Sequence, residues 1–336
     1  MPTAVSQIKK ANTAVLSRHY GNCRMREPVR PCLLCHSELE LSMADLKDTR
    51  FGTKDSYDIY RCTECGLEQT RPLPALPTLK KLYQSHYNFG GESGTLYTRL
   101  REQFIFSSLY NLWTLLDGDT AFHLRVGTGR MLDIGCNEGR GLRIYARNGF
   151  EVEGLELNEN AAAVAKRTGF AVHTCLLSEL DSESVYDVAV LSNVLEHSIN
   201  PLAMLHDVRR ILAPGGQVWI SCPNSRSWLR VLFGRAWINW HVPFHISHFS
   251  PETLTRVLAD AGYERIEIQQ ITPALWVAQS LIAKVLGRDN KENRHLRSPF
   301  LIPFLLLVCR FVLFPVLYFG NRVGRGDCLL AVATKV

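Results

Sequence analysis

Two pairs of cysteines have the spacing of a metal site. The first pair is Cys32 and Cys35, and the second is Cys62 and Cys65. Four thiolates are the soft, tetrahedral ligand set that Zn²⁺ prefers in a closed structural site. The alternatives are four unrelated core cysteines or one redox pair, but two such pairs rarely arise together by chance. We therefore expect structural zinc in a ribbon-like domain over residues 31–90.

A glycine-rich segment suits the binding of a nucleoside-containing cofactor. Residues 132–141 read LDIGCNEGRG, and glycines there let a ligand approach the backbone where a strand turns into a helix. The spacing is neither the GxGxxG dinucleotide fingerprint nor a phosphate-binding loop ending in Gly-Lys-Ser/Thr. Glu156 follows Gly135 by 21 residues. At the end of the next expected strand, its carboxylate can accept hydrogen bonds from two ribose hydroxyls.

Four histidines are candidates for proton transfer because imidazole titrates close to neutral pH. His197 follows an expected strand at the functional edge of the sheet, and a structural role there is an equal alternative. His241, His245 and His248 are four and three residues apart, which suggests a lid over a substrate or a second metal cluster. Histidines that only brace a loop fit this spacing at least as well.

The elements that must position these residues alternate between strands and helices. The expected strands are 131–134, 152–157, 171–176, 186–192, 217–222, 265–271 and 328–334, with helices over 158–168, 201–212 and 250–261 between them. This alternation predicts an α/β fold with a doubly wound, mostly parallel sheet of seven strands. The main domain is expected over 95–272, with a last strand over 328–336. Strand within 51–60 and helices over 79–87 and 96–116 are expected before the main sheet.

These segments, taken in order, resemble the class I S-adenosylmethionine (SAM)-dependent methyltransferases that act on small molecules. LDIGCNEGRG is similar to their first motif, and LEL at 155–157 is similar to their acidic second motif. Residues 186–224 are similar to their fourth and fifth strands, and residues 245–263 to the helix that follows. The resemblance covers about 130–334 and implies SAM as the methyl donor.

The resemblance also implies a set of cofactor-binding residues. The glycines would approach the methionine part of SAM, Glu156 would hold the ribose, and Asn193 and Val194 would line the mouth beside the sulfonium. Many members carry an acid after the third strand, whereas this chain has Thr-Cys-Leu-Leu at 174–177, so adenine would rest on backbone groups or on Ser178 and Glu179. The full implied set is Asp133, Gly135, Cys136, Asn137, Gly139, Glu156, Leu157, Asn193 and Val194.

A hydrophobic insertion, 273–327, separates the last two strands. Residues 299–320 are nearly continuous apolar sequence with Arg310 in the middle. A single membrane span is disfavoured because the last strand must return to the sheet, and because a mid-span arginine costs about 2.5–3.5 kcal/mol on insertion scales. We expect a peripheral or re-entrant helical pair at a membrane surface, with a buried helical cap as the alternative.

Charge is distributed unevenly along the 336 residues. Residues 1–30 form a basic segment of net charge +5, residues 281–336 carry +6, and the part between them carries −5. An acidic body makes nucleic acid an unlikely partner, whereas basic ends suit an anionic membrane surface. The first residues contain no continuous apolar run of a secretory signal, so we expect a cytoplasmic protein, placed at the cytoplasmic face of the membrane if 299–320 contacts lipid.

Together these features predict a SAM-dependent methyltransferase that carries structural zinc. The expected acceptor is a small molecule, with a sugar hydroxyl or a lipid-linked glycan near the membrane as the favoured class. Two alternatives remain open: a non-catalytic binding or scaffold protein on the same fold, and an RNA methyltransferase guided by the ribbon.

Overall fold

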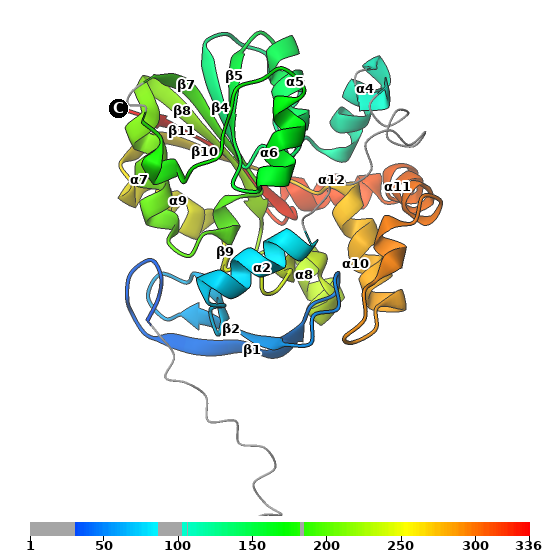
Figure 1. The fold of residues 1–336 in the computed structure, drawn as a ribbon. Helices are drawn as coiled ribbons and strands as arrows, with labels where there is room; N and C mark the ends of the chain where they lie inside the picture. Colours follow the sequence, from blue (N-terminus) through cyan, green and yellow to red (C-terminus); the bar gives the residue numbers. More distant parts are fainter. Residues whose placement is uncertain (1–30, 87–102, 106, 182–184) are drawn as a thin grey trace, which may run out of the picture. The chain divides into compact units, whose positions relative to one another are not determined.

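The computed structural model describes residues 31–86, 103–105, 107–181 and 185–336, which belong to one compact unit from Pro31 to Val336. Figure 1 shows a large sheet with helices on either side and a smaller sheet below it. The large sheet is built from β4 (Arg130–Ile134), β5 (Glu151–Leu155), β6 (Val172–His173), β7 (Tyr186–Ser192), β8 (Leu212–Pro223), β10 (Tyr263–Ile271) and β11 (Cys328–Lys335).

The seven strands follow the order β10-β11-β8-β7-β4-β5-β6. The strand pairs from β8 to β6 are parallel, and β11 runs antiparallel to both of its neighbours. The expected doubly wound, mostly parallel sheet of seven strands is therefore confirmed. The third strand is shorter than the sequence suggested, since only Val172 and His173 of the expected 171–176 pair with a neighbour.

Both faces of the large sheet are covered, which explains why its central strands are hydrophobic at nearly every position. Leu132, Ala189 and Ile220 belong to the core that includes the buried residues of α7 and α9. Met131 and Val190, which alternate with them, pack in a separate core with Tyr145 of α5. The helices of this unit are α5 (Arg140–Arg147), α6 (Glu159–Lys166), α7 (Pro201–Ile211) and α9 (Pro251–Asp260), with 3₁₀ turns η1 (Leu177–Glu179) and η2 (Leu195–His197).

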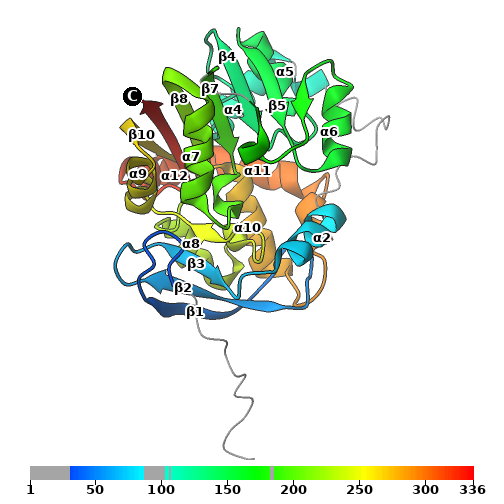
Figure 2. The ribbon, with the colours of Figure 1, turned by 60° about the vertical axis from the view of Figure 1, so that its left-hand side comes forward.

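The smaller sheet carries the cysteine pairs and is antiparallel throughout. Its strands are β1 (Leu39–Lys47), β2 (Ser56–Cys62), β3 (Glu68–Arg71) and β9 (Ser247–His248), in the order β1-β2-β3-β9. The strand β9 lies much later in the sequence, between β8 and α9, so the main unit contributes one strand to the smaller sheet, which we call the ribbon sheet. Figure 2 shows β1, β2 and β3 beneath the main unit. The helix α2 (Leu76–His86) follows the ribbon, as expected, while strand structure begins at Ser56 rather than Phe51.

The long helix expected over 96–116 is wrong in its extent. The structure has a helix α4 (Ser108–Asp117) whose N-cap, Ser107, has an extended backbone, so α4 starts there and does not continue an earlier turn. Residues 96–102 and 106 lie outside the described residues. Apolar spacing persists through Ser107, which is why periodicity alone did not reveal the break.

The insertion between β10 and β11 is helical. It contains α10 (Ala274–Leu286), the turn η5 (Arg294–Arg297), α11 (Leu301–Phe311) and α12 (Phe314–Arg322), while α8 (Trp228–Phe233), η3 (Gly234–Ala236) and η4 (Ile238–Trp240) pack nearby. Within the described residues, no single helix is long and apolar enough to cross a membrane, although α11 and α12 together pass that test of length and composition with a bend of 66° between them. Leu306, Cys309 and Leu317 of this pair are buried in one core with Trp237.

Arg310, the lone charge of the apolar run, points into the protein. It is 8% exposed, and its guanidinium lies 3.0 Å from the carboxylate of Asp117 at the end of α4. Asp117 also accepts the backbone N–H of Ala274 at 2.7 Å. Burial raises the pKa of Asp117, and the nearby Arg310 opposes that rise. This one carboxylate therefore joins α4, α10 and α11.

Replacing Arg310 by methionine should destabilise the protein by about 3–5 kcal/mol, because it leaves the Asp117 carboxylate buried without its counter-charge. The double variant Arg310→Met/Asp117→Asn should recover most of this loss. The matched control is Arg256→Met, which breaks an exposed pair with Asp260 at 3.6 Å and should cost less than about 1 kcal/mol. Urea unfolding measures all three, and equal costs for Arg310→Met and Arg256→Met would contradict the assignment.

Candidate functional site

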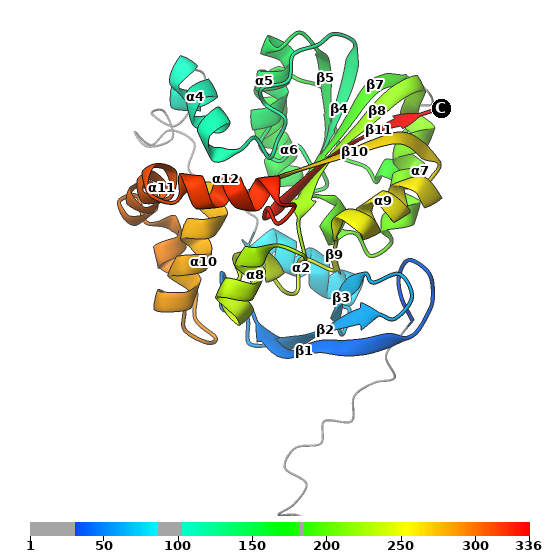
Figure 3. The ribbon, with the colours of Figure 1, turned by 180° about the vertical axis from the view of Figure 1, so that it is seen from behind.

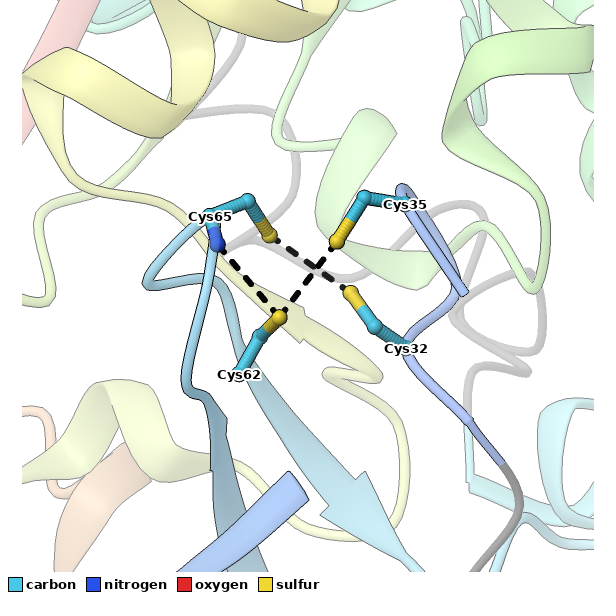
Figure 4. A group of neighbouring side chains, drawn as sticks. All are labelled: Cys32, Cys35, Cys62 and Cys65. Atoms are coloured by element: carbon cyan, nitrogen blue, oxygen red, sulfur yellow. Dashed lines mark hydrogen bonds between the residues drawn. The ribbon is translucent and has the colours of Figure 1, made fainter. Parts of the chain in front are cut away.

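The four cysteines converge as the sequence predicted. All four sulfurs lie within 4.8 Å of one another, and the Cys32–Cys65 and Cys35–Cys62 sulfur pairs are 3.5 and 3.4 Å apart (Figure 4). Tetrahedral Zn–S bonds of the usual length place sulfurs about 3.8 Å apart. Backbone N–H groups of Leu34 and Cys65 point at sulfurs of their own knuckles, each at 3.4 Å. The cluster therefore fits a structural Zn²⁺ bound by four thiolates.

The glycine-rich loop meets the end of β7, as a cofactor site at the carboxyl edge requires. Gly135 is exposed and has φ +72°, and a Cβ there would lie 2.8 Å from a methyl group of Val194. Asn193 also has a positive φ, 55°, and its N–H donates to the Ser221 carbonyl at 2.9 Å. The structure thus brings together residues about sixty positions apart in the sequence, and it leaves the backbone at Gly135 open to a ligand.

Glu156 ties the two loops of this edge together. Its carboxylate accepts the N–H of Asn137 at 2.9 Å and the N–H of Asn158 at 2.7 Å. Each carboxylate oxygen has two lone pairs, so both can still accept a ribose hydroxyl. Leu157 beside it is 58% exposed, as expected for a residue that lines an open site. Gly139, with φ +79°, starts α5 without a side-chain cap, so the first N–H groups of that helix can bind a ligand carboxylate.

Two of the residues implied in cofactor binding, Asp133 and Cys136, have buried side chains. Asp133 is buried, and a Cβ at Gly141 would lie 2.6 Å from its carboxylate, so the side chain supports the first turn of α5. Burial and, next, the charge of Glu156 raise the pKa of Asp133 to about 7. Cys136 is buried, and a Cβ at Gly154 would lie 2.6 Å from its sulfur. The thiol therefore faces the core, and only the backbone of Cys136 can face the cofactor.

On the side expected to hold adenine, Glu179 has a local partner. Its carboxylate accepts the N–H of Leu176 at 3.0 Å, which closes the turn η1, and both Ser178 and Glu179 are exposed. These side chains lie at the surface after β6, where the sequence placed them.

Three of the four candidate histidines form a cluster. The ring centres of His197 and His245 are 4.7 Å apart, and those of His241 and His245 are 4.9 Å apart. His248 lies on β9 instead, where its Nε2 is 3.0 Å from the hydroxyl of Thr70. The expected histidine group is therefore divided into a cluster of three and one residue within the ribbon sheet.

One hydrogen bond fixes the tautomer of His245. Its Nδ1 lies 2.8 Å from the carbonyl of Asn239, and because a carbonyl only accepts, this Nδ1 carries the proton and Nε2 has the lone pair in the neutral ring. His197 Nδ1 lies 3.0 Å from the carbonyl of Phe244 and 2.7 Å from the hydroxyl of Tyr83, which can donate or accept, so the tautomer of His197 depends on the direction of the Tyr83 hydrogen bond. Burial is the main cause that lowers the pKa of His197 to about 4 and that of His245 well below its usual value. Both rings are therefore neutral at physiological pH.

Glu196 is the unusual member of this group. It is 1% exposed, and its carboxylate oxygens have no hydrogen-bond partner within the described part of the chain. Its Oε1 is 3.9 Å from His245 Nε2, and burial raises its pKa to about 8. Ligand atoms of Glu196, His197 and His245 lie within 4.8 Å of one another. Such a group could bridge a cation or exchange a proton.

Several residues of the site were missed from the sequence. Tyr83 of α2 places its hydroxyl 2.7 Å from His197 Nδ1, and Phe51 of the ribbon packs on His241 and Phe244 with ring centres 5.7 and 5.5 Å away. Glu196 could have been suspected as the neighbour of His197 in the sequence. The two aromatic residues carried no such signal, because they come from segments that meet the site only after folding.

Known proteins match the part of the chain that holds the glycine-rich loop. A family profile described as methyltransferase domain matches residues 98–268. The ubiquinone biosynthesis O-methyltransferase of Azoarcus sp. (strain BH72) is 27% identical over 187 residues, covering 51% of this chain and 78% of that enzyme. The enzyme of the same name from Klebsiella pneumoniae (strain 342) is 30% identical over 126 residues, 34% of this chain and 51% of that one.

Solved structures give more distant likenesses. A SAM-dependent methyltransferase from Archaeoglobus fulgidus is 20% identical with a TM-score of 0.44, covering 72% of this chain and 100% of that one. Geranyl diphosphate C-methyltransferase from Streptomyces coelicolor A3(2) is 15% identical with a TM-score of 0.47, covering 78% and 100%. The family match spans half of the chain and coincides with the loop that Glu156 closes. The chain therefore belongs to this methyltransferase domain family and is a SAM-dependent methyltransferase.

Proposed function

We propose that the enzyme methylates a hydroxyl group of a small molecule, with a sugar hydroxyl or lipid-linked glycan as the acceptor class and His197 as the proton acceptor. The observation that carries this proposal is a neutral His197 just beyond the carboxyl end of β7, three residues after Val194. The O-methyltransferases among the relatives support a hydroxyl as the acceptor.

The roles of the residues follow from their positions. SAM, when bound, supplies the methyl group from its sulfonium. Gly135, Gly139 and Glu156 would hold it, and Asn193 and Val194 would line the place where an acceptor oxygen must lie in line with the methyl group. His197 Nε2 takes the hydroxyl proton as the new C–O bond forms. In this proposal the Nδ1 proton of His197 is donated to the Phe244 carbonyl, which leaves the Nε2 lone pair to accept the hydroxyl proton.

Glu196 suits the exit of that proton. A protonated carboxyl beside His245 can relay a proton by accepting it on one oxygen while releasing its own proton from the other, so that Glu196 stays neutral throughout. Two unpaired charges would be costly at this depth. Asp133 and Glu156, by contrast, belong to the cofactor side.

The acceptor is proposed to reach the site from a membrane surface. Exposed apolar side chains of α4, α11 and α12 form what we call the apolar face: Leu109, Leu112, Leu115, Leu116, Phe300, Phe304, Leu307, Phe311, Phe314, Val316, Phe319 and Val323. On α11 the spacing of Phe304, Leu307 and Phe311 places them on one side of the helix, and α4 and α11 lie on the same side of the protein (Figure 3). Exposed apolar side chains gathered on neighbouring helices are typical of an interaction site.

The charges around the apolar face favour an anionic bilayer over a second copy of the chain. Arg294 and Arg297 have side chains 89% and 61% exposed, and Arg322 is exposed with its guanidinium over the ring of Tyr318. Glu292 lies 3.8 Å from both Arg294 and Arg297 and offsets one of these charges. Cationic edges would repel each other across a symmetric dimer, whereas each can add roughly 1 kcal/mol near anionic lipid.

Replacing Glu156 by alanine should weaken SAM binding about 10- to 100-fold, because it removes both the ribose acceptor and the carboxylate that holds Asn137 and Asn158. Glu151→Ala is the matched control, an exposed glutamate at the other end of the same strand. Calorimetric titration of SAM and S-adenosylhomocysteine measures the effect. A folded Glu156→Ala protein with unchanged affinity would contradict the cofactor assignment.

Methyl-labelled SAM, incubated with the enzyme and a total lipid extract, should deliver label to the organic phase. His197→Asn should slow this transfer about 10²- to 10⁴-fold, whereas His206→Asn, on the exposed side of α7, should not. Because His197 must be neutral to accept a proton, the rate should be constant near neutral pH and fall as the pH is lowered through about 4. Label found only in water-soluble sugars or in RNA would exclude a lipid-linked acceptor.

The double variant Phe304→Glu/Phe311→Glu should reduce binding to phosphatidylcholine vesicles that contain phosphatidylglycerol by about tenfold or more, because it places charge where two phenyl rings enter the lipid. Binding of the unaltered protein should weaken with salt and with omission of phosphatidylglycerol. Val126→Glu, at a 78% exposed position before β4, is the control. Vesicle flotation that is equal for both variants would contradict the membrane contact, and so would a dimer in solution that dissociates only in the double variant.

A further inference from the structure

The ribbon and one candidate histidine, His248, share one sheet. Strand β3 pairs with β2 on one side and with β9 on the other, where Glu68 lies opposite His248 and Gln69 lies opposite Ser247. The N–H of Thr70 continues the pairing by donating to the carbonyl of Ile246 at 2.9 Å. The segment 241–248, which we call the histidine loop, is thus bonded through its last residues, 246–248, to the strand that follows the second cysteine pair.

One face of β3 holds the cysteine cluster. Gln69 is fully buried, and its amide Nε2 donates to the sulfur of Cys32 at 3.1 Å. Its carbonyl oxygen accepts from the N–H of Leu33 at 3.1 Å and from Arg71 at 2.8 Å. Donation to a thiolate compensates part of the negative charge on the sulfur, so the strength of this hydrogen bond depends on whether the sulfur is bound to metal.

The next residue holds the histidine loop. Thr70 is also fully buried, and its hydroxyl donates to the carbonyl of His245 at 2.6 Å. The hydroxyl has a single proton, so the 3.0 Å contact with His248 Nε2 must be donated by the histidine. Adjacent strand residues point to opposite faces. A shift of β3 at Gln69 would therefore move the backbone of His245 through Thr70.

His245 in turn contacts His197 and Glu196. Its ring lies against that of His197, and Ile246 beside it donates its N–H to the carbonyl of Glu196 at 2.8 Å. The chain of direct contacts runs from Cys32 through Gln69, Thr70 and His245 to His197.

We propose that the metal-loaded ribbon is a wall of the acceptor site, and that Gln69 and Thr70 are positioning residues that hold His245 and His197 in place. This inference rests on the proposed role of the histidines in methyl transfer. When zinc leaves, the two knuckles lose their common ligand, β3 loses its anchor at Cys32, and the histidine loop loosens. The glycine-rich loop, where the N–H of Asn137 donates to the carboxylate of Glu156, keeps its own hydrogen bonds. Zinc loss should therefore disable the acceptor side and spare SAM binding.

The test is Thr70→Val in the full-length, zinc-loaded protein, with Thr63→Val as control. Thr63 is an exposed ribbon residue whose hydroxyl donates to the Glu38 carbonyl at 3.3 Å, away from the histidine loop. Thr70→Val should retain zinc and SAM affinity, shift the ring ¹⁵N signals of His245 and His197, and lower kcat for methyl transfer about tenfold with little change in KM. Thr63→Val should change none of these.

A second measurement removes the metal from the unaltered protein with a chelator. The same histidine signals should shift, SAM should still bind, and both effects should reverse when zinc is restored. Unchanged histidine signals in folded Thr70→Val or in metal-free protein would overturn the proposal. If chelation unfolds the chain, the Thr70→Val variant alone tests the proposal. Shifted histidine signals together with an active His197→Asn variant would retain the coupling and refute the proposed role of His197 instead.

Discussion

The complete burial of a polar segment constrains this structure more than any other feature. Every residue from His241 to Ser250 is buried, including three histidines and two serines. A buried polar group without a partner costs about 1–3 kcal/mol, so this segment is stable only if other elements supply its hydrogen bonds. The ribbon does so through β3 and Thr70, and the η4 turn does so through the Asn239 carbonyl. The small sheet is thus a structural requirement of the main unit.

The two halves of the site were not equally predictable from sequence. The cofactor half depends on local patterns: glycines at a strand-to-helix turn, Glu156 at a strand end, and hydrophobic strands at regular spacing. These features can be recognised in the sequence because the carboxyl ends of parallel strands always meet at one edge of the sheet. The cysteine pairs are equally local, since each knuckle needs only its own four residues. The structure brings these residues together as expected, and their contacts with SAM stay a prediction.

The acceptor half depends on partners that are distant in sequence. Nothing in β3 indicates that its free edge pairs with Ser247 and His248, and nothing around Tyr83 indicates that it will meet His197. From the sequence, Arg310 was expected to oppose membrane insertion, but its ion pair with Asp117 is visible only in the folded structure. The break before Ser108 was hidden for a related reason, since apolar spacing continues through it. The family match, 98–268, begins after the ribbon and ends before the helical insertion, so it contains the glycine-rich loop and the candidate histidines but neither of these two parts.

The strand pairing of β10 with β11 has a consequence for how such an enzyme could change its acceptor. Ile271 and Cys328 are directly opposite each other in that pair, and the whole helical insertion leaves the sheet at one and returns at the other. The two ends of the insertion are therefore held at the separation of a single antiparallel residue pair, about 5 Å. A short turn or a different cap could occupy the same gap without altering the strand order. Evolution could in this way exchange the helical insertion, which is proposed to meet the acceptor, while the seven-stranded sheet stays unchanged.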